Sequence, residues 1–155
     1  MLVFLDIDGV MVPAKGHLTP DLLKDGFAAF SANACHALHS LITEFDATII
    51  LTTSHKSNYS LQEWETIFQT RGVQAKKIKS LPVNLRHLSR KEEIFNWFNV
   101  NTINEDFVII DDDKSLNDLP DYLKGHLILT SSYVGLTEDH LDEIRARFTK
   151  RGTDL

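Results

Sequence analysis

The stretch Leu2-Val3-Phe4-Leu5-Asp6-Ile7-Asp8-Gly9-Val10 joins an apolar run directly to an acidic turn. The run does not alternate between apolar and polar residues, which is typical of a parallel strand covered on both faces. Asp6 and Asp8 follow at the point where such a strand would end. The stretch therefore predicts a buried strand that delivers two carboxylates to one edge of a sheet.

Three further apolar runs also predict buried strands. Two of them, like the first, end directly in a group of polar residues, and the third comes close to the end of the chain. The runs, with the polar residues that follow them, are 47–51 with Thr52 and Thr53, 107–110 with Asp111, Asp112 and Asp113, and 126–130.

Segments with apolar residues at helical spacing lie between the predicted strands. Ser60–Glu63 and Ser89–Glu92 have the capping-box pattern and predict the first residues of two helices. We expect another short helix over 19–30, with Pro20 at its first position. The basic segment 76–79 is interpreted as a solvated connection.

The alternation of strands and helices predicts an α/β fold. The simplest arrangement is a doubly wound, Rossmann-like parallel sheet with right-handed crossovers. We see no internal repeat, low-complexity tract or linker, so we expect residues 1–155 to form a single domain.

Composition narrows the class of protein. The chain has 155 residues and a formal net charge of −6, which argues against general affinity for nucleic acid or anionic membranes. The single cysteine, Cys35, excludes an internal disulfide and a multi-cysteine zinc site. No apolar run is long enough to span a bilayer, so we expect a soluble, cytoplasmic protein.

The polar residues at the strand ends are expected to lie together, because ligands of open parallel sheets bind at the carboxyl ends of the strands. Several carboxylates packed together repel one another, and a divalent cation relieves this repulsion. A site made only of oxygen ligands favours Mg²⁺ over zinc or copper. Lys91, in the first turn of its capped helix, would add an ammonium group for phosphate oxygens. The arrangement therefore predicts phosphoryl chemistry.

The four groups of residues, in this order, resemble the motifs of the haloacid dehalogenase superfamily. Residues 4–10 are similar to the first motif, an apolar strand followed by Asp-x-Asp-Gly, and 49–54 are similar to the second, a strand ending in Thr or Ser. Lys91 is similar to the third motif, and 108–113 to the fourth, a strand that ends in paired acids. The resemblance implies a phosphatase rather than a dehalogenase, because position 8 is an acid.

The resemblance also implies a role for each site residue. Asp6 would attack phosphorus and form an aspartyl-phosphate, and Asp8 would act first as general acid and then as general base. Mg²⁺ would be bound by the carboxylates of Asp6 and Asp111 and by the backbone carbonyl of Asp8. Asp112 would hold a metal-bound water or orient Lys91. The hydroxyl that bonds the phosphoryl group would come from Thr52 or Thr53, with Ser54 as a third candidate.

Members of this superfamily often carry a cap domain, but the gaps between the motifs are too short for one here. An open site can admit a phosphate carried by a small molecule, a nucleic-acid end or a phosphoprotein. Residues 129–137 contain a Gly-Leu-Thr segment that is similar to small family members associated with RNA repair. His55 and Lys56 are interpreted as polar loop residues, with contact to the substrate as the alternative.

Two other classes of protein share some of these features. A signalling receiver domain also gathers acids, Thr and Lys around magnesium, but there the paired acids come first and Thr and Lys come later. The order in this chain argues against it. The other alternative is a catalytically silent family member that serves as a binding or regulatory module. Such proteins usually lack the nucleophile or the general acid, whereas Asp6 and Asp8 are both present.

Overall fold

A parallel sheet forms the centre of the computed structural model, which describes residues 1–16 and 18–148. Within these residues the sheet has five strands in the spatial order β3-β2-β1-β4-β5, and all neighbouring strands are parallel. The register pairs Leu5 of the central strand β1 with Leu51 on one side and Ile110 on the other. The strands are β1 (Leu2–Leu5), β2 (Thr48–Leu51), β3 (Ile78–Ser80), β4 (Phe107–Asp111) and β5 (Leu127–Leu129).

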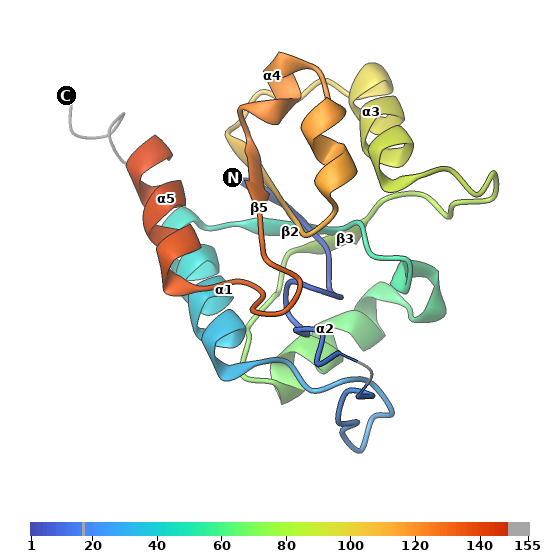
Figure 1. Cartoon of the computed structure of the whole chain (residues 1–155), viewed down its shortest axis with the longest axis vertical. Coiled ribbons are helices and arrows are strands. Elements are labelled where there is room, and N and C mark those ends of the chain that lie inside the picture. Colours follow the sequence, from blue (N-terminus) through green and yellow to red (C-terminus); the bar gives the residue numbers. More distant parts are fainter. Residues whose placement is uncertain (17, 149–155) are drawn as a thin grey trace.

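Helices cover both faces of this sheet, as Figure 1 shows. Successive residues of a strand point to opposite faces, so Leu5 packs in a core with α1, α2 and α5, while Phe4 packs in a second core with α3 and α4. The predicted doubly wound α/β fold is therefore confirmed. The helices are α1 (Ala32–Phe45), α2 (Leu61–Thr70), α3 (Arg90–Val100), α4 (Asp121–Lys124) and α5 (Glu138–Phe148), with two short 3₁₀ helices, η1 (Lys56–Asn58) and η2 (Lys114–Asp118).

Both predicted capping boxes are present. Ser60 Oγ accepts from the backbone N–H of Glu63 at 3.1 Å, and Ser89 Oγ accepts from that of Glu92 at 3.2 Å. In each box the glutamate side chain also accepts from the backbone of the serine. The second box makes Arg90 the first residue of α3, which places that residue at the edge of the sheet where the acidic residues lie.

The interpretation of 76–79 as a solvated connection is wrong in part. Ile78–Ser80 forms the edge strand β3, which pairs with β2. The Ile78 side chain is buried, whereas Lys79 on the other face is exposed. A single buried residue next to lysines gives a weak strand pattern, so the pairing with β2 decides the structure of this segment.

The predicted helix over 19–30 is also wrong, because this segment forms a loop. Arg71 fixes the loop from the end of α2. Its guanidinium donates to the carboxylate of Asp25 at 2.7 and 3.0 Å, and to the carbonyl oxygens of Phe27 and Ala28 at 2.9 Å. Isolated short helices are marginal, and these tertiary hydrogen bonds hold the backbone in a different shape.

The described residues between β1 and α1 and between β2 and α3 form no globular cap domain. None of the helices within 1–16 and 18–148 is long and apolar enough to cross a membrane. The expected domain extends to residue 155, but 149–155 lie outside the described residues, so that boundary stays a prediction.

Candidate active site

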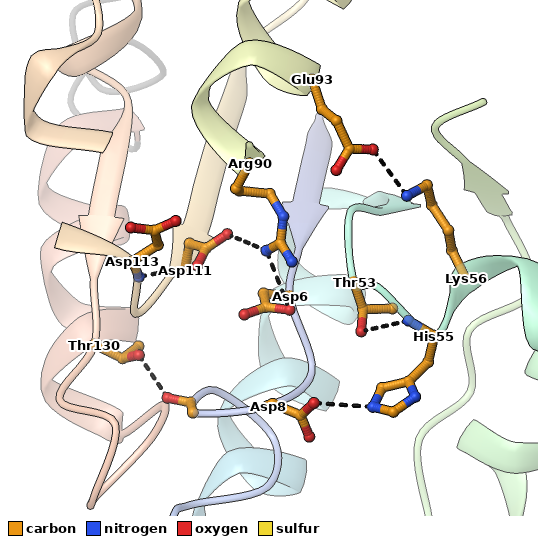
Figure 2. A network of polar contacts seen from close by, with 11 residues as sticks. Asp6, Asp8, Thr53, His55, Lys56, Arg90, Glu93, Asp111, Asp113 and Thr130 are labelled. Atoms are coloured by element: carbon orange, nitrogen blue, oxygen red, sulfur yellow. Dashed lines mark hydrogen bonds and ion pairs between the residues drawn. The ribbon is translucent and has the colours of Figure 1, made fainter. Parts of the chain in front are cut away.

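Asp6, Thr52 and Asp111 lie side by side at the carboxyl edge of the sheet, and Figure 2 shows Asp6 next to Asp111. The hydrogen-bond ladder continues past the strand ends, because Asp6 N donates to Ile110 O at 3.1 Å and Thr52 N donates to Leu5 O at 3.0 Å. The buried strands therefore fix these residues through their backbones. This is the convergence that the strand pattern predicts.

Three carboxylates form a cluster here. One oxygen from each of Asp6, Asp111 and Asp112 lies within 4.8 Å of the others. Burial, together with the negative charge of Asp111, raises the pKa of Asp6 to about 8. Burial also raises the pKa of Asp111. Without a bound cation, the pair therefore retains a proton at a pH where ordinary aspartates are ionised.

Arg90 is the cation that contacts this cluster among the described residues. Its Nη1 donates to Asp111 Oδ2 at 2.7 Å and lies 3.2 Å from Asp6 Oδ1. In the described part of the chain, Lys91 makes no hydrogen bond or ion pair through its side chain. Consecutive residues of a helix point about 100° apart, so the side chains of Arg90 and Lys91 leave α3 in different directions.

Asp112 packs against the turn that follows β1. Gly9 has a φ of +79°, and a Cβ atom added to it would lie 2.1 Å from Asp112 Oδ2. On the other side of this turn, Thr130 Oγ1 donates to the carbonyl oxygen of Gly9 at 2.7 Å. The residues after β5 thus support the acidic turn.

The Gly-Leu-Thr segment also contacts this turn. Leu136 N donates to Val10 O at 2.8 Å, and a Cβ on Gly135 would lie 2.4 Å from that same oxygen. A residue with a side chain at 135 would therefore push the segment away from the acidic turn. This close approach gives a structural reason for glycine at the position.

The two candidate threonines differ in their surroundings. Thr53 Oγ1 accepts from the backbone N–H of His55 at 3.3 Å. Thr52 Oγ1 is buried and has no hydrogen-bond partner among the described residues. Ser54 is exposed to solvent. A buried hydroxyl without a partner is costly, so an incoming oxygen beside Asp6 would satisfy Thr52.

Asp8 lies at the rim of the site rather than in the cluster. Its side chain is 61% exposed, and its Oδ2 lies 2.9 Å from His55 Nε2. The acid predicted to exchange protons with the substrate is thus separated from the carboxylates that could hold a metal (Figure 2).

Lys56 and Glu93 form a buried ion pair beside the site, with 2.8 Å between Lys56 Nζ and Glu93 Oε2. The two side chains are only 4% and 10% exposed. Arg90, Glu93 and the burial of Lys56 are not among the features that the sequence predicts. The Ser-His-Lys-Ser segment gives no apolar pattern that would predict a buried lysine, whereas the neighbouring charges in Arg90-Lys91-Glu92-Glu93 could have raised the question of which cation faces the site.

A comparison with models of protein families agrees with this geometry. A family model described as "HAD domain in Swiss Army Knife RNA repair proteins" matches residues 2–141. A search of curated proteins and a search of solved structures each found no significant match. The matched range includes every strand and all the site residues named above.

Proposed function

Because the chain belongs to the family of haloacid dehalogenase (HAD) domains found in Swiss Army Knife RNA repair proteins, we propose that it is a magnesium-dependent phosphohydrolase with Asp6 as its nucleophile. The observation that supports this most is the cluster of Asp6, Asp111 and Asp112 at the ends of the neighbouring parallel strands β1 and β4, in which Asp6 and Asp111 are buried and Asp112 is half-buried. Buried carboxylates are unfavourable without a cation, and this site keeps them beside an unpaired hydroxyl.

The residues fit a Mg²⁺ ion. The cluster offers oxygen ligands only, which is the donor set that Mg²⁺ favours. The carboxylates of Asp6 and Asp111 would hold the ion, with the Asp8 backbone carbonyl as the family resemblance implies, and Asp112 would hold a bound water. When bound, Mg²⁺ supplies positive charge that offsets the negative charge of the phosphate and of the attacking carboxylate.

The chain's own residues would supply the nucleophile and the groups that bind the phosphoryl oxygens. A carboxylate oxygen of Asp6 attacks phosphorus, and the bond between phosphorus and the leaving oxygen breaks. The Thr52 hydroxyl donates to a phosphoryl oxygen, and Arg90 balances the charge of another, because these groups lie next to Asp6. Positioning and charge stabilisation are the main requirements of such a transition state.

Asp8 would serve both half-reactions. In its protonated form it gives a proton to the leaving oxygen, and as a carboxylate it then takes a proton from the water that attacks the aspartyl-phosphate. Its exposed position at the rim supports this proposal, since both the leaving group and the water come from the solvent side. The buried Asp6 thus serves as nucleophile, and the exposed Asp8 serves as general acid and base.

For the substrate, we propose a phosphate at an RNA end. The family description supports this choice, and the absence of a cap among the described residues leaves room for a polymer. The test is phosphate release from RNA oligonucleotides with a 5′- or 3′-phosphate, compared with DNA of the same sequence, a phosphopeptide and a sugar phosphate. Each is measured with Mg²⁺ and with a chelator, using the native protein and Asp6→Asn.

We expect magnesium-dependent release that is fastest from an RNA end and lost in Asp6→Asn. Faster release from the phosphopeptide or the sugar phosphate would contradict the choice of RNA as substrate, but it would still support a phosphohydrolase. No release from any substrate would favour the silent binding module.

A further inference from the structure

We propose that His55 is a positioning residue that holds the Asp8 carboxyl group in the orientation needed for proton transfer. This inference rests on the proposed function, because Asp8 exchanges protons with a substrate only if the chain hydrolyses phosphate esters. His55 itself touches no reacting atom in this account and acts through Asp8.

The first support is the contact between the two side chains. His55 Nε2 lies 2.9 Å from Asp8 Oδ2, as Figure 2 shows. Within residues 1–16 and 18–148, no other hydrogen bond or ion pair reaches the Asp8 carboxylate. An exposed aspartate otherwise samples several rotamers. The contact with His55 selects one of them and leaves Oδ1 available for the substrate.

The second support is that the imidazole is held independently of Asp8. The His55 backbone N–H donates to Thr53 Oγ1 at 3.3 Å. The His55 ring packs edge-on against Phe27, with 5.4 Å between the ring centroids and an interplanar angle of 88°. Phe27 is itself buried, and its carbonyl oxygen accepts from Arg71 at 2.9 Å. Because the imidazole of His55 is held in place by these contacts and the exposed Asp8 carboxylate is not, His55 orients Asp8 rather than the reverse.

The third support is the place of the pair relative to a bound leaving group. Asp8 and His55 line the same pocket of about 320 Å³, together with Phe27 and Tyr59. A leaving group that enters this pocket meets Asp8 with the imidazole beside it. Small errors in the position of an acid or base cost rate even when the residue itself is intact.

The test uses two variants that separate packing from hydrogen bonding. His55→Phe keeps an aromatic ring against Phe27 but removes the hydrogen bond to Asp8, whereas His55→Gln keeps a side-chain N–H donor. The matched control is His36→Phe, because His36 is an exposed histidine on α1. Thermal melting of each protein checks that it is folded.

Each protein is assayed with an alkyl phosphate and with dinitrophenyl phosphate. Dinitrophenolate leaves without needing a proton, so the first half-reaction, which kcat/KM reports, depends strongly on Asp8 only for the alkyl ester. For His55→Phe we expect kcat/KM to fall about tenfold or more for the alkyl ester and much less for the dinitrophenyl ester. His55→Gln should retain most of the activity toward both esters, and His36→Phe should match the native protein.

A merely structural role would lower kcat/KM equally for the two esters and would not be rescued by Gln, and that result would overturn the proposal. Native activity of His55→Phe on both esters would also overturn the proposal about His55. In that case, magnesium-dependent turnover by the native protein would still support the proposed function. No turnover of either ester by the native protein would overturn the proposed function and, with it, this inference.

Discussion

The carboxylate of Asp112 rests directly on Gly9, so closely that a Cβ at position 9 would lie 2.1 Å from Asp112 Oδ2. The two residues are far apart in the sequence, one after β1 and the other after β4, and the central pairing of these strands brings them together. The glycine therefore gives Asp112 the space it needs to join Asp6 and Asp111.

Gly9→Ala should weaken Mg²⁺ binding, because Asp112 must move to make room for the methyl group. We expect about a tenfold loss of affinity, in the range found for groups that support metal ligands. The measurement is Mg²⁺ titration by calorimetry at constant pH.

The matched control for Gly9→Ala is Gly72→Ala. Gly72 also has a positive φ, +83°, but among the described residues no heavy atom outside Gly72 and its two chain neighbours lies within 4 Å of the position its Cβ would take. This variant should lose about 1–2 kcal/mol of stability from the backbone conformation alone and bind Mg²⁺ like the native protein. Equal Mg²⁺ affinity in Gly9→Ala and the native protein would contradict the role given to the glycine.

Thr52→Val should mainly reduce activity, whereas Thr53→Val should mainly reduce stability. Thr52→Val removes a buried hydroxyl without a partner, so the free energy of unfolding should stay the same or rise. Thr53→Val removes the acceptor for the His55 N–H, so the free energy of unfolding should fall by about 1 kcal/mol. Phosphate release should fall about 100-fold in Thr52→Val and much less in Thr53→Val.

Urea unfolding and steady-state assays on the same preparations test both threonine predictions, with Thr52→Ser as a variant that keeps the hydroxyl. A larger loss of activity in Thr53→Val would assign the phosphoryl contact to Thr53 instead.

Arg90→Met and Lys91→Met separate the two neighbouring cations at the start of α3. Arg90 contacts both Asp6 and Asp111, so its loss should lower the stability of the metal-free protein at pH 8 by about 3 kcal/mol and strongly reduce phosphate release. Lys91→Met should change stability by less than about 0.5 kcal/mol. If Lys91→Met proves the more damaging variant in the activity assay, the third motif lies at Lys91, as the family resemblance implies.

The metal-free protein should lose stability as the pH rises from about 4 to about 8. The folded state retains a proton on Asp6 up to its pKa of about 8, whereas the unfolded chain releases that proton near the ordinary aspartate pKa of 3.8. Between these values the folded state binds more protons, so stability falls by about 1 kcal/mol per pH unit.

Urea unfolding in chelator at several pH values measures this slope, and Asp6→Asn should flatten it. Added Mg²⁺ should stabilise the native protein more at pH 8 than at pH 6, because metal binding requires the deprotonated carboxylate. If the free energy of unfolding falls with pH at the same slope in Asp6→Asn, groups other than Asp6 cause the pH dependence.

The positions of Asp6, Thr52 and Asp111 could be predicted from the sequence because strands buried on both faces leave a long apolar pattern, and parallel topology brings their ends together. Helix starts at Ser60 and Ser89 were equally predictable, since a capping box is a local interaction.

The choice between Arg90 and Lys91 could not be predicted, because it depends on how α3 is rotated against the sheet. The loop over 19–30 and the burial of Lys56 depend on tertiary partners, Arg71 and Glu93, that no local pattern indicates. The contact between His55 and Asp8 likewise joins two turns that become neighbours only through the pairing of β1 with β2.

The most direct test of the central claim is to trap the aspartyl-phosphate. Asp8→Asn lacks the base for the second step, so it should accumulate the intermediate when mixed with dinitrophenyl phosphate and Mg²⁺. After an acid quench, peptide mass spectrometry should find one phosphoryl group on Asp6, and the double variant that also carries Asp6→Asn should show none. A protein that turns over this ester without labelling Asp6, or that keeps its turnover after Asp6→Asn, would contradict the account.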